Sequence, residues 1–345
     1  MIKFFRKIRQ NLLKENKTGK YLKYAIGEIV LVVIGIMIAL SINNWNESLK
    51  QEAKIIGALK EIHSNLSEDI IEINSIIPNY RKEDSIINIL IAKKLSANDF
   101  KGNQGFLNSL TACQYYGLNV NENGYKLLMK NSNNIPNKYQ TIFKSLKNIY
   151  IKDKASLDIS LKFSNDQILK YLSHLEKNEE WYTDWTYNNK LTPKAIDFFS
   201  KDPYFKNHMT QYFLLSISNY YYDLHRFRVD AEESYQDLTK ILQLEDVVAL
   251  DSTYHSSINI KDYEYFLGTY KEDSTNSTAI ISFESDELYY QWNNYEKVKL
   301  YPISKSTFIT ATKPVFNSIQ IDSLGQVISH NWRFGNQQGT MNKIN

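Results

Sequence analysis

The chain has 345 residues, of which 43% are hydrophobic and 23% charged, a composition typical of folded proteins rather than of disordered ones. Its formal net charge is +3, but eight basic residues and one acidic residue fall within residues 1–24, so the rest of the chain is mildly acidic. That part lacks the basic surface of a nucleic-acid-binding protein, and we expect no nucleic-acid partner. Cys113 is the only cysteine, which excludes an intramolecular disulfide and a cysteine-based zinc site.

Residues 1–24 are predicted to form a basic amphipathic tail. Phe5, Ile8 and Leu12 recur on one side of a helix, and basic side chains surround the other side. Such a segment lies on a membrane surface, so anionic lipid is its expected partner.

Residues 25–42 are predicted to be a transmembrane helix. They read AIGEIVLVVIGIMIALSI, and this length is near the minimum for crossing a hydrocarbon core of about 30 Å. Basic residues dominate only the preceding flank, and positive flanks stay cytoplasmic. We therefore expect an inner-membrane protein with a cytoplasmic N-terminus and most of its chain in the periplasm. The alternative is a cleaved signal peptide, because Ala39-Leu40-Ser41 loosely resembles a cleavage site.

Three residues of this segment are candidates for interactions in the membrane. Glu28, in the first turn, either reaches the cytoplasmic headgroups beside Lys20 or Lys23 or has a proton-carrying or partner-binding role. Gly35 and Ala39 form a small-xxx-small pair, which lets two such helices approach closely.

A heptad pattern of apolar residues continues beyond the span and predicts a long helical stalk. It fits an antiparallel bundle within one chain as well as a parallel dimer, and Pro78 is expected to kink or divide the helix. His63 on the seam is interpreted as a polar core residue, and Glu52 and Asp84 are faults in the pattern. The apolar positions are Leu49, Ile56, Leu59, Leu66, Ile70, Ile73, Ile77, Tyr80, Ile87 and Ile91.

Residues 43–245 are predicted to form one extracytoplasmic helical stalk and bundle. No glycine occurs between Gly124 and Gly268, which favours long helices, and the polar link 98–105 is expected to be a loop. Helices are predicted over 138–175, 192–200 and 205–242. The last of these carries a charged cluster that we interpret as a solvated face, since no nucleophile accompanies it. The cluster consists of Asp223, His225, Arg226, Arg228 and Asp230.

Residues 255–345 are predicted to form a C-terminal β-module, because short alternating runs replace the helical period near Tyr254. Seven strands in so short a segment favour a small antiparallel barrel or sandwich. The turn from Asp322 to Gly325 is expected to close a hairpin. The predicted strands are 266–271, 278–284, 287–292, 297–301, 307–312, 315–322 and 326–334. The complete fold class is therefore membrane-anchored α+β.

Two segments resemble known families. Residues 1–47, from MIKFFRKIRQ to SINNWNE, resemble the N-terminus of a large family of uncharacterised Bacteroidota envelope proteins, and the resemblance extends toward residue 245 through segments such as 124–128. Residues 267–270, 288–289, 300–302, 307–308 and 322–327 are similar to the lipocalin-like barrel appended to serine β-lactamase-related hydrolases. The catalytic S-x-x-K motif of those enzymes is absent before the module, so the resemblance implies only the accessory barrel.

No catalytic, cofactor or metal constellation is identified in the sequence, which leaves three functional hypotheses. The first is a non-catalytic membrane-tethered interaction or scaffolding protein, self-associating through its stalk or binding an envelope protein or saccharide. The second is a sensor whose β-module binds a ligand, and the third is a hydrolase. Tyr289, Tyr290, Trp292 and Tyr295 are the candidate recognition surface, although alternation along a strand buries about half of such residues.

Overall fold

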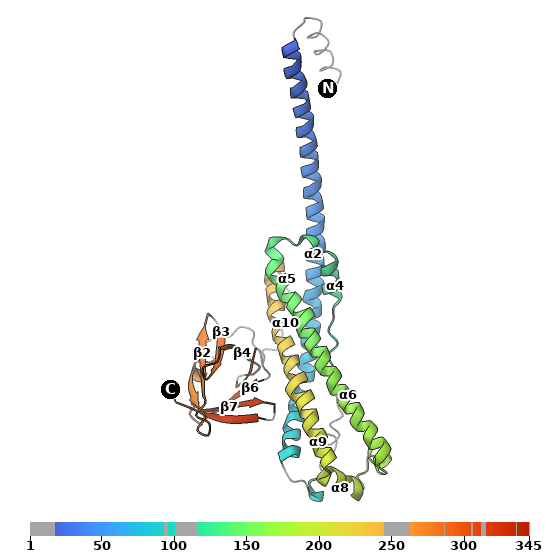
Figure 1. Ribbon diagram of the computed structural model, residues 1–345, viewed down its shortest axis with the longest axis vertical. Helices are drawn as coiled ribbons and strands as arrows, with labels where there is room; N and C mark the ends of the chain where they lie inside the picture. The colour runs from blue at the N-terminus through green and yellow to red at the C-terminus, as the bar shows by residue number, and fades with distance from the viewer. Residues whose placement is uncertain are drawn as a thin grey trace.

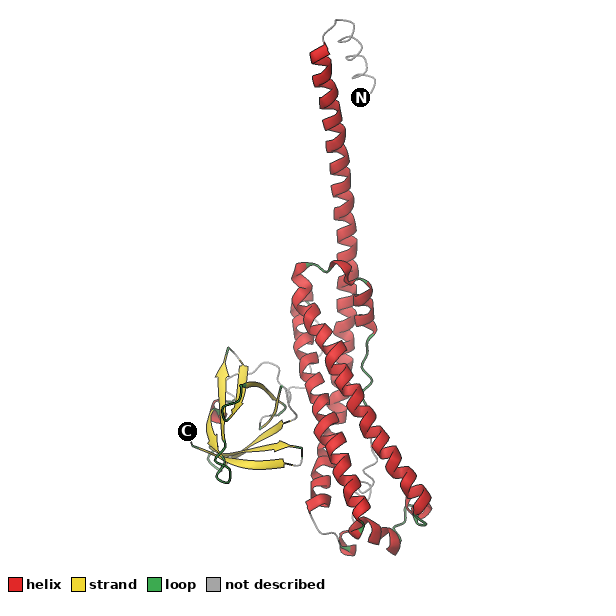
Figure 2. Ribbon diagram, viewed as in Figure 1, coloured by secondary structure: helices red, strands yellow, loops and turns green. Residues whose placement is uncertain are grey.

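A computed structural model of the chain describes residues 18–92, 96–100, 116–244, 263–285, 287–304, 306–311, 315–335 and 337–344. The predicted amphipathic tail up to residue 17, Cys113 and the boundary near Tyr254 lie outside these residues. A helical bundle and a β-barrel stand side by side, and one helix projects far beyond both (Figure 1). Helices and strands are fully segregated along the chain (Figure 2). The predicted α+β architecture is confirmed.

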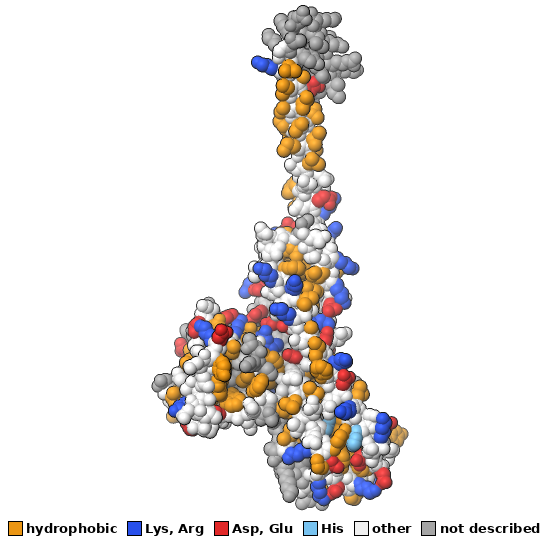
Figure 3. All heavy atoms as spheres, in the orientation of Figure 1, with side chains coloured by type: hydrophobic (Ala, Val, Ile, Leu, Met, Phe, Trp, Pro, Cys, Tyr) orange, Lys and Arg blue, Asp and Glu red, His pale blue; other side chains and the backbone are white. Residues whose placement is uncertain are grey.

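The helical part begins with α2, Thr18–Ala92, whose N-terminal half projects alone from the bundle (Figure 1). Apolar side chains of residues 26–42 cover this projecting part and are exposed (Figure 3). Among the described residues, α2 is the helix long and apolar enough to cross a membrane.

The remaining helices fold back along the lower half of α2. Two continuous helical rods, residues 140–178 and 203–242, each contain a π-helical segment. The elements are η1 Ala97–Phe100, α4 Asn123–Lys130, η2 Ser132–Asn134, η3 Asn137–Tyr139, α5 Gln140–Lys147, η4 Asn148–Asp153, α6 Lys154–Asn178, α7 Tyr182–Thr186, α8 Pro193–Lys201, α9 Pro203–Tyr212, η5 Phe213–Tyr220 and α10 Tyr221–Leu242.

The predicted helices agree with these bounds to within a few residues, and local chemistry sets two of the starts. Thr192 and Asp202 are N-cap residues whose side chains accept hydrogen bonds from the backbone N–H groups of Ala195 and Tyr204. A proline occupies the first helical position in both cases. A backbone N–H at this position would have no acceptor within the helix, so proline, which lacks it, loses no hydrogen bond.

The heptad seam of α2 is buried inside the chain's own bundle. From Leu59 to Ile87 its apolar positions pack mainly against α10 and α4, whereas the predicted position Leu49 is 48% exposed. His63 is also a core residue, as predicted: its Nε2 is 2.8 Å from Thr239 Oγ1, and its ring stacks on that of Tyr235. Of the two arrangements that the heptad allowed, the structure has the intrachain antiparallel bundle.

Of the two effects expected of Pro78, a kink or a division of the helix, division does not occur, because α2 is continuous through it. Proline removes one backbone hydrogen bond and clashes with the preceding turn, at a cost of about 3 kcal/mol. Ile73, Ile77 and Tyr80, on both sides of the proline, are fully buried. Their burial offsets this cost, since each large side chain contributes about 1.5 to 3 kcal/mol.

The C-terminal part is a closed antiparallel barrel of eight strands in sequential order, preceded by η7, Glu264–Phe266. Its own core is separate from that of the bundle. The strands are β1 Gly268–Lys271, β2 Thr278–Glu284, β3 Glu287–Trp292, β4 Val298–Pro302, β5 Thr307–Thr310, β6 Val315–Ile321, β7 Val327–Phe334 and β8 Gln337–Lys343.

Three details of the barrel differ from the sequence-based prediction. Residues 264–266 form a 3-10 turn rather than the start of β1, and β5 ends at Thr310. The eighth strand, β8, was not predicted, because QQGTMNK lacks the alternation of β-branched and aromatic residues that indicates a strand. The β6–β7 hairpin is confirmed: Gly325 has φ +80°, and the Asp322 carboxylate accepts hydrogen bonds from the N–H groups of Leu324 and Gln326 at 2.8 Å.

Candidate functional site

The four aromatic residues proposed as a recognition surface do not share one exposed face. Tyr290 lies in the barrel core and Trp292 packs partly against it. Tyr289 is on the outer face, where its hydroxyl donates to Glu287 Oε2 at 2.9 Å. Tyr295 is 71% exposed. Tyr290 is therefore excluded from an exposed surface, and Tyr295 is the freely accessible member of the set.

Aromatic side chains fill the interior of the barrel. Phe266 stacks on Phe308 with 4.5 Å between ring centroids, and Tyr270 and Tyr290 pack edge-on around His330. His330 Nε2 is 2.8 Å from Asn317 Oδ1, and burial lowers the pKa of the imidazole to about 3. The ring is thus neutral at physiological pH. An interior packed in this way is a core rather than a ligand cavity, so the surface available to a ligand is the outside of the barrel.

The charged cluster on α10 is buried, and its interpretation as a solvated face is wrong. Arg228 is 2% exposed; its Nη1 donates to Glu232 Oε2 at 2.8 Å and its Nε to Asn74 Oδ1 at 2.7 Å. His225 is fully buried against Tyr221, and burial together with the nearby Arg228 and Arg81 lowers its pKa to about 3. These groups join α10 to α2 in the core.

A second buried group of charges lies where α10 meets the barrel. Arg226 Nη2 donates to Asp230 Oδ2 at 2.8 Å, and the guanidinium lies 4.6 Å from the ring centroid of Tyr301 on β4. Burial and the neighbouring Asp230 carboxylate raise the pKa of Asp153. Arg226, paired with Asp230, compensates part of the negative charge at this junction.

Two further carboxyl groups are buried in the bundle. Burial raises the pKa of Asp69 and of Glu83 to about 7 in each case. Asp69 accepts hydrogen bonds from the backbone N–H of Asn121, and Glu83 accepts one from the hydroxyl of Tyr212. These carboxyl groups bridge α2 to other parts of the bundle, and they make its stability depend on pH.

We expect Glu83→Gln to stabilise the chain relative to the wild type as pH rises. Between the ordinary carboxyl pKa of 4.5 and about 7, folded Glu83 keeps a proton that the unfolded chain loses. The wild-type free energy of unfolding therefore falls with pH across this window, and glutamine removes that loss. The stability difference between variant and wild type should shift in favour of the variant by about 2 to 3 kcal/mol between about pH 5 and about pH 8.

Urea unfolding followed by circular dichroism at both pH values measures this difference. The matched control is Glu61→Gln, on the same helix with an exposed side chain. A Glu83→Gln effect that was the same at both pH values would show that the folded chain holds Glu83 ionised throughout.

The barrel is fixed to the bundle by contacts from several strands. Arg333 Nη1 on β7 lies 2.7 Å from both carboxylate oxygens of Asp84 on α2, and Tyr222 donates from its hydroxyl to the carbonyl of Thr310 at 2.8 Å. Lys299 Nζ is 3.2 Å from Glu233 Oε1. Asp84 is the heptad fault identified in the sequence. A carboxylate interrupts the apolar seam here because this position pairs with the barrel.

Two adjacent rows of side chains on the outer face of β5–β8 have different environments. The register places Ile309, Phe316 and Arg333 side by side, and this row packs on the bundle. The next row has hydroxyl and amide side chains at every position. In strand order from β5 to β8 it consists of Thr307, Ser318, Asn331 and Thr340.

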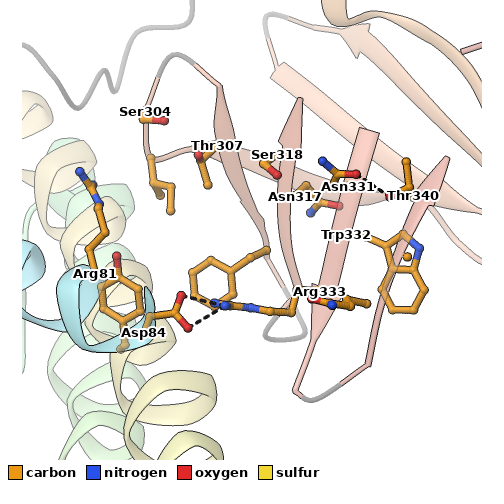
Figure 4. Close-up of a pocket in the computed structure, with 15 residues that line it drawn as sticks. Arg81, Asp84, Ser304, Thr307, Asn317, Ser318, Asn331, Trp332, Arg333 and Thr340 are labelled. Carbon is orange, nitrogen blue, oxygen red and sulfur yellow. Dashed lines mark hydrogen bonds and ion pairs between the residues drawn. The ribbon is translucent and has the colours of Figure 1, made fainter. Parts of the chain in front are cut away.

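This polar row lines a groove of about 770 Å³ between the barrel and the bundle. Figure 4 shows the row running across the strands, with Ser304 at one end and with Arg81 and Asp84 approaching from α2. Thr340 donates from its hydroxyl to Asn331 Oδ1 at 2.8 Å. Among the described lining residues, Arg81, Arg333 and Asp84 are charged, and Arg333 is paired with Asp84.

The groove offers hydrogen-bonding side chains rather than a catalytic set. Its described lining residues include serine and threonine hydroxyls but no histidine that would activate them. Across the described ranges, no group of three or more His, Cys, Asp or Glu side chains is placed to hold a metal ion. The groove was not predicted from the sequence, because its residues meet only once the register of four strands is known.

The membrane candidates lie on the projecting part of α2. Glu28 is partly buried, whereas Gly35 and Ala39 are exposed, and a Cβ added at Gly35 would have no neighbour within 4 Å. The pairing of two such helices remains a prediction.

Residues 28–150 match the model of a family of unknown function, DUF6090. The match covers most of the predicted span, the stalk and the first part of the bundle, and it confirms the expected resemblance to such a family over these residues. No curated protein and no solved structure matches the chain.

Proposed function

We propose that this chain is a single-pass membrane protein that holds a non-catalytic recognition unit, the bundle with its barrel, at a fixed distance from the inner membrane. The supporting observation is the continuity of α2, which extends from the exposed apolar segment 25–42 into the bundle core without a break. Residues 43–54, at about 1.5 Å per residue, separate the span from the first fully buried core residue, Ile55, by about 18 Å.

The bilayer is the first partner in this proposal. The basic tail faces the cytoplasm, and the bundle and barrel lie in the periplasm. The apolar side chains of α2 from Ile55 onward pack inside the chain's own bundle. Self-association would therefore use the span, with Gly35 and Ala39, and the exposed first part of the stalk, which includes Trp45 and Leu49.

A topology experiment tests the proposal. Alkaline phosphatase fused after Asn46 should be active, because the enzyme folds only outside the cytoplasm, whereas a fusion before Ala25 should be inactive. The reverse pattern would contradict the proposed orientation. A mature N-terminus near Ile42, detected by mass spectrometry of the purified chain, would show instead that residues 25–42 belong to a cleaved signal.

The non-catalytic part of the proposal has its own test. The purified full-length chain should not hydrolyse ester, amide or glycoside reporters. Hydrolysis that a substitution of a groove residue abolished would contradict it and would favour the hydrolase hypothesis.

One observation favours a sensor as the second candidate function. Arg81 and Asp84, which line the groove, belong to α2, the helix that also contains the proposed span. A molecule bound in the groove would therefore contact the element that leads to the membrane. In this proposal α2 itself enters the bilayer, so a signal from the groove would pass along α2 to a partner protein in the cytoplasm or the membrane.

A further inference from the structure

We propose that a second copy of this chain packs against the outward face of α6, so that two recognition units stand side by side on one membrane. The proposal rests on the proposed function, because the membrane anchor gives both copies the same orientation. It concerns a surface on the first helical rod, residues 140–178, that neither the barrel nor the rest of the bundle covers.

A row of apolar side chains runs along the outer surface of this rod. Ile151, Ile159 and Phe163 are 53%, 55% and 53% exposed, and Ala155 between them is also exposed. Residues spaced by four lie above one another on a helix, so these side chains form one continuous row. Exposed apolar side chains are visible on this part of the bundle (Figure 3).

The second helical rod, residues 203–242, has no such row. Among the described residues of this rod, Ile241 near its end is the one large apolar side chain that is exposed. Single exposed apolar residues are common on protein surfaces, whereas a contiguous set marks an interaction surface. The row on the first rod is therefore a specific feature that calls for a partner.

A row of charges beside the apolar row suits a copy of the same surface. Asp158, Lys162, Asp166 and Lys170 are exposed, and they too are spaced by four, with alternating sign. The row has no net charge, so two copies do not repel each other. A displacement by one helical turn brings an acidic residue of one copy beside a basic residue of the other. A strongly acidic or strongly basic partner would meet like charges along the same row.

The apolar area of this face matches what a stable pair needs. Leu169, 62% exposed, lies on the other side of the charged row and adds to the surface. With Ile151, Ile159 and Phe163 it makes four large side chains, each offering about 100 Å² at about half exposure, or about 400 Å² per copy. A standard interface buries about 800 Å² per partner, of which about 450 Å² is apolar.

The membrane favours a two-fold arrangement. Two copies anchored in one bilayer share an orientation, and a two-fold axis along the membrane normal brings the same patch of both copies together. The barrel packs on another part of the bundle, so it leaves this face open (Figure 1). Contacts near the span and contacts on α6 would then hold the pair at two heights above the cytoplasmic side.

Sedimentation equilibrium of the full-length chain in detergent micelles measures the association. Ile159→Asp with Phe163→Asp should raise the dissociation constant at least about 10-fold, because carboxylates from both copies meet in the interface. The matched control is Ile71→Asp with Ile89→Asp, the same change at side chains of α2 that are 52% and 49% exposed. It should leave the dissociation constant unchanged, and circular dichroism checks that each variant is folded.

Cross-linking in membranes identifies the occupant of the face. In a Cys113→Ser background, Ile159→Cys treated with a short bis-maleimide should give an adduct of twice the mass of the chain. The matched control is Asp237→Cys, at an exposed position on α10, which should give no such adduct. An adduct of another mass would show that a different protein covers the face, and it would overturn the second copy as the occupant.

The remaining outcomes separate this proposal from the proposed function. A wild-type chain that is monomeric at all concentrations and gives no adduct would overturn the pair. Equal weakening by the two double variants would overturn α6 as the contact surface. The alkaline phosphatase fusions report orientation whether or not the chains associate, so either result would leave the topology standing.

Discussion

Replacing Ile70 and Ile73 together by aspartate is expected to unfold the helical bundle. Both side chains are fully buried on the seam of α2, where they pack among the bundle helices. The change removes two large apolar groups from the core, each contributing about 1.5 to 3 kcal/mol, and places two carboxyl groups there without partners. A total cost of several kcal/mol is comparable with the whole stability of a domain, about 5 to 15 kcal/mol.

Thermal unfolding of the full-length chain in detergent, followed by circular dichroism at 222 nm, measures this effect. We expect the double variant to lose its cooperative helical transition. The control is Ile71→Asp, which places the same charge between the two positions on a side chain that is 52% exposed. A double variant that melted like the wild type would show that this seam does not stabilise the bundle.

The stalk shows how far periodicity predicts this fold. The apolar heptad positions from Leu59 to Ile87 are buried as predicted, because spacing along a helix determines which side chains share a face, whereas Leu49 is 48% exposed. The heptad did not identify the partner, since an apolar seam packs equally well on a second chain or on a returning helix. The two acidic residues that interrupt the heptad pattern form ion pairs that only the structure shows. Asp84 pairs with Arg333 on the barrel, and Glu52 with Lys138 at the upper end of the bundle.

The candidate groove, in contrast to the stalk, is not predicted by periodicity. Alternation along β5–β7 indicated which side chains point outward, but the row formed by Thr307, Ser318, Asn331 and Thr340 depends on the relative register of four strands. The last of these strands was not predicted at all. Register is a property of pairing rather than of any one segment. The sequence-based recognition surface was instead the four aromatic residues Tyr289, Tyr290, Trp292 and Tyr295, chosen because aromatic rings offer stacking surfaces.

The charged cluster of α10 was misinterpreted for a different reason. Charged residues on helices are usually solvated, and composition alone does not show when a charged residue has a buried partner. In this bundle the partner is four residues away: Glu232 follows Arg228 at one helical turn, and both are almost fully buried. Asn74 on α2 completes the set by accepting from Arg228 Nε. The i,i+4 spacing of Arg228 and Glu232 is the sequence signal for this pair.

Replacing Arg228 by methionine is therefore expected to destabilise the chain strongly, by about 3 to 5 kcal/mol, because it removes the positive charge that is paired with the buried Glu232 carboxylate. The double variant Arg228→Met with Glu232→Leu should recover most of this loss, since a buried ion pair can be replaced by apolar groups of similar volume at little cost. Urea unfolding of the full-length chain measures both effects, and Lys240→Met is the control for the same change at an exposed position on α10. A double variant as unstable as Arg228→Met would show that the contribution of Arg228 comes from its bond to Asn74 and from its packing. Recovery in the double variant would instead assign the loss to the uncompensated carboxylate, and it would establish that the cluster is structural.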